Sequence, residues 1–273
     1  MGWITWLASY PKSGNTWVRA FLANYMAGEA EPLPLDRLTE YATGESGAHL
    51  YRRHDPRDPA AYTIEDVQRL RPLVHRDLAA AASGPVFVKT HNAVRLVRGL
   101  PLLTPAVTGG AIYVLRDPRD VAVSYGRHLG RPIDWVISYM ADPGASLADT
   151  GKVFEQPSSW SIHVASWTER PNKRLHVMRY EDMAADPGAA FRAMLGFLGQ
   201  DPKPERLALA LDHSRFETLQ AQEQAQGFAE KPVGAPTFFH TGRAGQWREA
   251  LTPEQARRIE HDHGAEMRRW RYL

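Results

Sequence analysis

The chain has 273 residues and a mass of 30.6 kDa, which suits one large domain or two small ones and excludes a peptide hormone or a lone repeat. Hydrophobic residues make up 43% and charged residues 23%, values that exclude a wholly disordered chain. The net charge of +2 predicts no general affinity for nucleic acid or membranes, so any anion site must be local. Because cysteine is absent, disulfides, Cys-ligated metal centres and thiol nucleophiles are also excluded.

The N-terminal residues 1–12 do not have the pattern of a signal peptide, since no basic segment precedes the apolar residues and no small-residue cleavage site follows them. Trp6 stands where a myristoylation signal requires Ser or Thr. No apolar run approaches the roughly 20 residues that a membrane span requires. We therefore expect a cytoplasmic protein with no membrane span.

The first 26 residues predict a strand, a polar loop and a helix. Trp3 to Tyr10 is a short apolar, β-prone run that ends before Pro11, as expected of a buried strand. From Trp17 to Tyr25, apolar side chains recur at helical spacing. The residues suited to cap the start of this helix are Ser13, Asn15 and Thr16.

Along the rest of the chain, predicted strands alternate with predicted helices. Residues 27–62 are expected to be mostly irregular, with a helical signal only from Leu35 to Tyr41, and residues 220–239 are expected to form a mobile surface loop. The predicted strands are 86–90, 111–115 and 175–180, and the predicted helices are 64–82, one starting near 116–120, 191–198 and 253–271. This alternation predicts an α/β fold in which one domain, residues 1–273, has a central, mainly parallel sheet flanked by helices.

The loop between the first strand and the first helix has the chemistry of an anion site. A strand that leads through a loop into a helix directs backbone N–H groups and the positive helix end at the loop, and Lys12 adds a charge. The loop resembles a P-loop in this respect, but it is not a Walker A motif, because Lys12 precedes the only glycine, Gly14. The alternative is an ordinary surface lysine in a turn.

Lys89 and His91 lie at i and i+2 at the end of the second predicted strand, so both side chains leave the same face of the sheet. Ligands of open α/β sheets bind outside the carboxyl ends of the strands, which makes His91 a candidate general base. The alternative is that His91 is structural.

The third predicted strand ends at Arg116, within a segment rich in positive charge. Residues 89–131 hold seven Lys and Arg residues but only two Asp residues, so an anion is expected to bind here. A solvated helix with Arg–Asp pairs is the alternative; it would explain Arg119 and Asp120 but not Arg116.

Five segments together resemble the cytosolic-type sulfotransferases, in their order and their spacing. These enzymes use 3′-phosphoadenosine 5′-phosphosulfate (PAPS) as sulfuryl donor and release 3′-phosphoadenosine 5′-phosphate (PAP). The resemblance runs from about Trp6 to Thr252. The segments are YPKSGNTW (10–17), KTH (89–91), YVLRDPRDVAVSY (113–125), RYEDM (179–183) and GRAGQW (242–247).

The resemblance implies a role for each matching residue. His91 would be the general base, with Lys12 and Lys89 stabilising charge in sulfuryl transfer. The residues implied to bind the 5′-phosphosulfate are Lys12, Ser13, Gly14, Asn15, Thr16 and Trp17; those implied at the 3′-phosphate are Arg116 and Ser124; those implied at the adenine are Trp17, Tyr180, Ser214 and Phe216. Trp160 and His163 match a segment near the acceptor in relatives.

The sequence also departs from the family pattern. Many relatives have Arg-Lys-Gly before the last loop, whereas this chain has His240, Thr241 and Gly242, so two cations expected at the 3′-phosphate are missing. We expect Arg243 to compensate, with His240 contributing when it is protonated. The C-terminal dimer segment of the family is poorly kept, because Pro253 and Arg257 are out of pattern, which argues against dimerisation through it.

Two other functions remain open from the sequence. A P-loop-like nucleotide or small-molecule kinase would need Mg²⁺ and a lysine after the loop glycine, which the sequence lacks. The segment His75 to Leu78 resembles the HRDL loop of protein kinases, but the glycine-rich loop and the DFG motif of those enzymes are absent. A non-catalytic PAP-binding module would keep Lys12 and Arg116 but lose His91. No metal site is expected, because His261-Asp262-His263 lacks HExxH spacing and lies on a charged helix expected to be exposed.

The acceptor is expected to be a small molecule that carries a hydroxyl group, or less favourably an amine. Residues 27–62, 128–160 and 220–239 are expected to contact it. Their aromatic side chains favour an aromatic, lipid-like or natural-product acceptor over a polyanionic glycan: Trp135, Tyr139, Phe154, Trp160, Phe228, Phe238 and Phe239.

Overall fold

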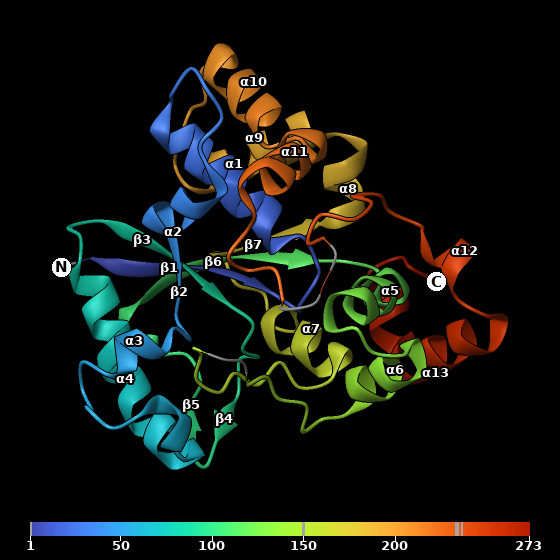
Figure 1. Ribbon diagram of the computed structural model, residues 1–273, viewed down its shortest axis with the longest axis horizontal. Helices are drawn as coiled ribbons and strands as arrows, with labels where there is room; N and C mark the ends of the chain where they lie inside the picture. Colours follow the sequence, from blue (N-terminus) through green and yellow to red (C-terminus); the bar gives the residue numbers. More distant parts are fainter. Residues whose placement is uncertain (1, 149–150, 233–234, 236) are drawn as a thin grey trace.

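A computed structural model describes residues 2–148, 151–232, 235 and 237–273. Its centre is a sheet of five parallel strands in the order β2-β3-β1-β6-β7 (Figure 1). The strands are β1 (Trp3–Ser9), β2 (Ala42–Gly44), β3 (Pro85–Thr90), β6 (Thr108–Leu115) and β7 (Leu175–Arg179). A separate antiparallel pair consists of β4 (Leu96–Val97) and β5 (Leu100–Pro101). The α/β class with a central parallel sheet is therefore confirmed.

Helices cover both faces of the sheet (Figure 1). One face carries α1 (Asn15–Ala27), α8 (Tyr180–Ala185), α9 (Pro187–Phe197), α10 (Pro204–His213) and α11 (Phe216–Gln226). The other face and the region beyond the strand ends carry α3 (Ala48–Tyr51), α4 (Ile64–Ala80), α5 (Pro118–Leu129), α6 (Ile133–Ala141), α7 (Trp160–Thr168) and α13 (Pro253–Arg269). The remaining short helices are α2 (Leu38–Tyr41), α12 (Trp247–Ala250) and the 3₁₀ turns Leu35–Arg37, Pro59–Ala61 and Pro105–Val107.

Alternation along β1 explains why two hydrophobic layers form. Trp6 and Ala8 belong to the layer that packs on α4, α5, α7 and α13, whereas Leu7 belongs to the layer that packs on α1, α9 and α10. A strand buried on both faces has no polar alternation, so its sequence is an uninterrupted apolar run. Because β1 pairs in parallel with β3 and with β6, the carboxyl ends of these three strands lie at one edge of the sheet, where the candidate loops begin.

Several expectations about the elements are corrected by the structure. The helical signal at 35–41 is confirmed, but residues 27–62 hold more regular structure than expected: the edge strand β2, which is too short to show periodicity, the helix α3 and the 3₁₀ turn Pro59–Ala61. Residues 220–226 belong to α11, so only the later part of 220–239 lacks regular structure; positions 233, 234 and 236 lie outside the described residues. The helix α1 begins at Asn15 and its N-cap is Gly14, so neither Ser13, Asn15 nor Thr16 caps it with a side chain.

Candidate active site

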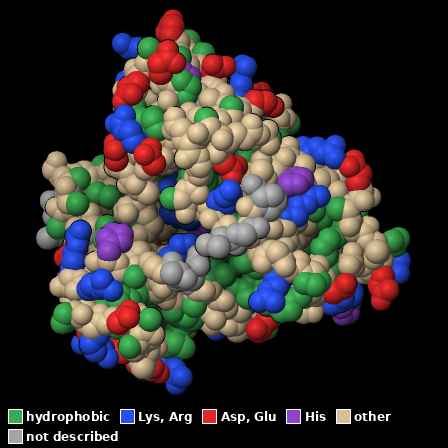
Figure 2. All heavy atoms as spheres, viewed as in Figure 1, with side chains coloured by type: hydrophobic (Ala, Val, Ile, Leu, Met, Phe, Trp, Pro, Cys, Tyr) green, Lys and Arg blue, Asp and Glu red, His purple; other side chains and the backbone are tan. Residues whose placement is uncertain are grey.

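A cavity of about 800 Å³ lies at the carboxyl ends of β1, β3 and β6. Figure 2 shows a hollow in this face of the molecule, with Lys and Arg side chains at its floor. The lining includes all of the predicted catalytic and donor-binding residues except Ser13 and Arg243. The predicted residues in the lining are Lys12, Gly14, Asn15, Thr16, Trp17, Lys89, His91, Arg116, Ser124, Tyr180, Ser214, Phe216, His240, Thr241 and Gly242.

The loop from Pro11 to Gly14 needs an unusual backbone. Lys12 has a φ of 65° and Gly14 a φ of 107°, both in the left-handed region. A Cβ on Gly14 would lie 2.8 Å from Cδ2 of Tyr180, so glycine is required both for the turn and for the close approach of that ring. Asn15 then donates from Nδ2 to the carbonyl of Leu7 at 2.8 Å and fixes the start of α1 to the strand.

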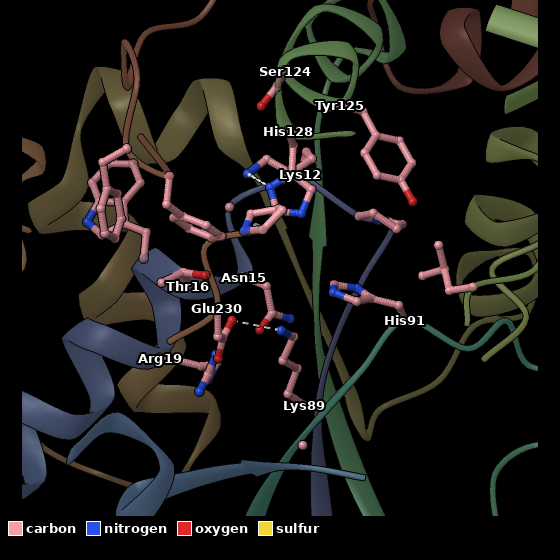
Figure 3. A pocket seen from close by; sticks show the side chains of 18 of the residues that line it. Lys12, Asn15, Thr16, Arg19, Lys89, His91, Ser124, Tyr125, His128 and Glu230 are labelled. Carbon is pink, nitrogen blue, oxygen red and sulfur yellow. Dashed lines mark hydrogen bonds and ion pairs between the residues drawn. The ribbon is translucent and has the colours of Figure 1, made fainter. Parts of the chain in front are cut away.

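Lys12 lies near the middle of the cavity (Figure 3). Its Nζ is 3.4 Å from Nδ1 of His128 and 4.0 Å from the centre of the Phe238 ring. Burial lowers the pKa of Lys12 to about 7, and the charges of Arg116 and Lys89 act in the same direction. An anion beside Lys12 would favour its charged form, so the loop is suited to a phosphate or a sulfate group.

His91 has a defined tautomer. Its Nδ1 lies 2.8 Å from the carbonyl oxygen of Ser9, which only accepts, so Nδ1 carries the proton and Nε2 is the free base. The main-chain N–H of His91 donates to Glu155 at 3.0 Å, and its carbonyl accepts from Nε2 of His163 at 3.2 Å. Burial, assisted by the charge of Lys89, lowers the pKa of His91 well below its ordinary value, so the ring is neutral at pH 7.

Lys89 and Arg19 share a carboxylate that sequence reasoning missed. Glu230 accepts from Nζ of Lys89 at 3.0 Å and from Nη1 of Arg19 at 2.5 Å, and Figure 3 shows the three groups together beside Asn15. Burial lowers the pKa of Lys89, whereas Glu230 opposes that change. Burial would raise the pKa of Glu230, but the two cations outweigh it and lower the pKa. No local pattern around Arg19 or Glu230 indicates a pair 211 residues apart.

Arg116 joins the loop to the opposite side of the cavity. Its guanidinium donates to the carbonyls of Lys12 at 3.2 Å and Arg243 at 3.0 Å, and it stacks 4.0 Å from the centre of the Tyr180 ring. The Tyr180 hydroxyl in turn donates to the carbonyl of Gly242 at 2.7 Å. The Nε atom of Arg116 and the hydroxyl of Ser13 are buried and have no hydrogen-bond partner among the described residues.

Arg243 and Arg127 differ in where their side chains lie. Arg243 is 58% exposed in its side chain and pairs with Glu249 at 2.6 Å, outside the cavity lining. Arg127, which the sequence reasoning included only in a charge count, lines the cavity one helical turn after Ser124. It donates to Gln246 at 2.8 Å.

The aromatic residues expected at the acceptor are mostly elsewhere. Of the seven, Phe238 and Phe239 line the cavity, whereas Trp160 is in the core and Trp135 is largely exposed. Trp160 and His163 are buried outside the cavity lining, and Nε2 of His163 donates to the carbonyl of His91. The expectation of an exposed segment at 261–263 is wrong for His263, which is buried and bonded to Ser161.

The paired charges at the end of β6 are also more buried than a solvated helix would allow. Arg119 stacks 3.9 Å from the Trp247 ring and pairs with Asp117 at 2.8 Å. Asp120 accepts from the main-chain N–H groups of Gly245 and Trp247. Arg119 and Asp120 therefore hold the GRAGQW segment (242–247) against α5.

A match to the sulfotransferase domain family covers residues 4–271. The chain belongs to the sulfotransferase family. Sulfotransferase 1 family member D1 of Rattus norvegicus is 28% identical over 278 residues, covering 96% of this chain and 82% of that protein. The luciferin sulfotransferase of Photinus pyralis is 28% identical over 226 residues, covering 78% of this chain and 55% of that protein. The protein is therefore an enzyme of a family of PAPS-dependent transferases.

Solved structures of sulfotransferases share the fold. Retinol dehydratase, in complex with androsterone and inactive cofactor PAP, has a TM-score of 0.66 at 19% identity and covers 97% of this chain and 80% of its own. A mouse sulfotransferase complexed with PAP has a TM-score of 0.61 at 19% identity and covers 97% of this chain and 84% of its own. Among the described residues, no helix has the length and apolar character to cross a bilayer.

Proposed function

We propose that this sulfotransferase moves the sulfuryl group of PAPS to a hydroxyl of a small-molecule acceptor, with His91 as general base. The observation that carries the proposal is the single cavity in which the Lys12 loop, Lys89 and the unprotonated Nε2 of His91 all meet. PAP in the structures of the mouse relative and of retinol dehydratase supports PAPS as the donor. We also propose that residues 1–273 form one sulfotransferase domain, since the family match covers 4–271.

The 5′-phosphosulfate is assigned to the loop of residues 12–17. The N–H groups at the start of α1 and the charge of Lys12 suit an anion, and the buried hydroxyl of Ser13 has no partner among the described residues. The adenine is assigned to the cavity wall formed by Trp17 and Tyr180, whose rings contact each other edge to face with centres 5.8 Å apart. Ser214 and Phe216 complete this wall.

The 3′-phosphate is assigned to Arg116 and Ser124, with the segment 240–243 opposite them. A 3′-phosphate carries nearly two negative charges, so one guanidinium leaves it under-compensated. Arg127 supplies a second cation in the cavity lining, whereas Arg243 contributes through its carbonyl, which orients Arg116. Gly242 has a φ of 62°, which lets the backbone turn closely over the anion.

In the proposed step, the acceptor oxygen attacks sulfur in line and the bond from sulfur to the 5′-phosphate oxygen breaks. Nε2 of His91 takes the hydroxyl proton, and the electron pair of the broken bond stays on PAP. Lys12 and Lys89 stabilise the charge on the bridging and sulfuryl oxygens. The transferring group carries less negative charge than a phosphoryl group, so the two lysines suffice and the proposal includes no metal.

The acceptor is proposed to be a small molecule with an aromatic or lipid-like part. The cavity that contains His91 is also lined by Tyr125, Leu129, Leu147, Val153 and Phe238. The androsterone and retinol complexes of retinol dehydratase agree with an acceptor of this size. A cytoplasmic location is proposed with it.

The proposed function is tested by incubating the protein with ³⁵S-labelled PAPS and a library of hydroxyl and amine acceptors. Transfer of label to a hydroxyl without added Mg²⁺ supports the proposal. Binding of PAP with no transfer to any acceptor would indicate a non-catalytic module, and transfer that persists at the normal rate in His91→Ala would remove His91 from the mechanism.

A further inference from the structure

Glu45 is a fully buried carboxylate whose two oxygens face different parts of the fold. Oε1 accepts from the Thr90 hydroxyl and, at 2.8 Å, from Nδ2 of Asn92. Oε2 accepts from Nε2 of His75 at 2.6 Å and lies 3.6 Å from Nη1 of Arg71. One oxygen is therefore anchored to α4 and the other holds the end of β3.

Thr90 and Asn92 are the residues on either side of His91. Oγ1 of Thr90 also accepts from the main-chain N–H of Asn92 at 3.0 Å, and the N–H of Glu45 donates to the carbonyl of Lys89 at 3.2 Å. Glu45 therefore bonds the side chain before His91, the side chain after it, and the main-chain carbonyl of Lys89. After Thr90 the chain no longer pairs with β1, so side-chain hydrogen bonds hold it in place of main-chain ones.

We propose that Glu45 is a positioning residue that holds the backbone around His91 so that its Nε2 stays directed into the cavity. The inference rests on the proposed role of His91 as general base. The ring is oriented by the Nδ1 bond to Ser9, and that bond requires the main chain of residue 91 to stay in place. When Glu45 no longer holds the flanking residues, the main chain of His91 keeps its bonds to Glu155 and His163 but is less constrained, so the Nδ1 proton is less firmly fixed.

The ionised form of Glu45 suits this role, since an ionised carboxylate only accepts and both flanking residues donate to it. Burial would raise the pKa of Glu45, but the bond from His75 and the charge of Arg71 outweigh it and lower the pKa. If the cluster only stabilised the fold, the loss of one of its hydroxyls would change the free energy of unfolding but not the His91 ring. If Glu45 positions His91, loss of the Thr90 hydroxyl beside it should also change the tautomer of the His91 ring.

Two matched variants separate these roles. Thr90→Val removes the hydroxyl that Glu45 binds next to His91, whereas Thr104→Val removes a hydroxyl of the same buried network, which bonds Nδ1 of His75 at 2.8 Å and contacts neither flank of His91. Glu45→Leu removes both bonds at once, and Thr90→Val carries the test if Glu45→Leu does not fold. Thermal unfolding of each variant measures the structural cost.

The first measurement is ¹⁵N NMR of the His91 ring in the enzyme without donor or acceptor, so it does not depend on the proposed function. We expect the wild type and Thr104→Val to show one neutral tautomer, with the proton on Nδ1. Thr90→Val and Glu45→Leu should show a mixture of the two tautomers. An unchanged ring in both of these variants would overturn the inference.

The second measurement is kcat with phenols of graded acidity. For phenols that are protonated at the assay pH, Thr90→Val should lower kcat on the order of tenfold while KM for PAPS is unchanged. Phenols that are already ionised need no base, so the loss should shrink for them, as it should in His91→Ala. Equal losses in Thr90→Val and Thr104→Val would overturn the inference, whereas a His91→Ala enzyme with no dependence on phenol acidity would overturn the proposed base.

Discussion

The lowered pKa of Lys12 predicts how donor binding depends on pH. Burial and the neighbouring cations lower this pKa to about 7 in the empty site, and a bound anion favours the charged form. PAP binding should therefore be accompanied by proton uptake. Because the free enzyme loses that proton as the pH rises, affinity should fall above pH 7.

The magnitude follows from the fraction of Lys12 that is protonated. With a free-enzyme pKa of about 7, the apparent dissociation constant of PAP should rise about fivefold from pH 7 to pH 8 and about fiftyfold from pH 7 to pH 9. The phosphates of PAP are already ionised in this window, since their second pKa is about 6. Proton uptake should be about half a proton at pH 7 and close to one proton at pH 8.5.

The assay is calorimetric titration with PAP in buffers of different ionisation enthalpy, which measures affinity and proton uptake together. Lys12→Arg is the matched control, because arginine stays charged throughout the window, and its affinity should change less than about twofold. Constant affinity of the wild type from pH 7 to pH 9 would refute the argument from burial. A Lys12→Arg protein with the wild-type slope would assign the proton to another group.

Three further predictions concern neighbouring charges. Because burial lowers the pKa of His91, kcat/KM should rise with pH through an inflection below pH 6.5 that His91→Asn removes, with a loss on the order of a hundredfold or more, measured in a pH–rate profile. Glu230→Gln leaves Arg19 and Lys89 without their carboxylate, so the free energy of unfolding should fall by about 1–3 kcal/mol in denaturant titrations while PAP binds more tightly; weaker binding of PAP would contradict this. Arg127→Ala should weaken PAP on the order of tenfold but not its analogue without the 3′-phosphate, and Arg243→Ala should have a smaller effect; the reverse order would return the role to Arg243.

The sequence was informative wherever a local pattern determines local structure. The apolar run of β1, the proline after it and the helical spacing from Trp17 predict a strand, a loop and a helix, and the structure confirms all three. The i, i+2 spacing of Lys89 and His91 places both in one cavity. Each of these features depends on neighbours within a few residues, which is the range that periodicity can report.

The sequence was uninformative where contacts join distant segments. Strand β2 has three residues and is a strand only because it pairs with β3, so residues 27–62 look irregular in the sequence. Glu45 bonds residues 30, 45 and 47 positions away, and Glu230 reaches Arg19 across 211 positions. The aromatic residues of 128–160 failed as acceptor markers for the same reason, since composition does not distinguish a core face from a cavity wall.

The cations of this site repel one another when no donor is bound, and this repulsion links two of the predictions. Lys12, Lys89, Arg19 and Arg116 surround one cavity, and like charges in a poorly solvated space destabilise each other. The fold reduces this cost in two ways: the pKa of Lys12 falls to about 7, and Glu230 places a carboxylate between Lys89 and Arg19. An anionic donor makes both arrangements unnecessary, because it restores the proton of Lys12 and competes with Glu230. Proton uptake and a tighter-binding Glu230→Gln variant are therefore two consequences of one cause, and observing the first without the second would place Glu230 outside the path of the donor.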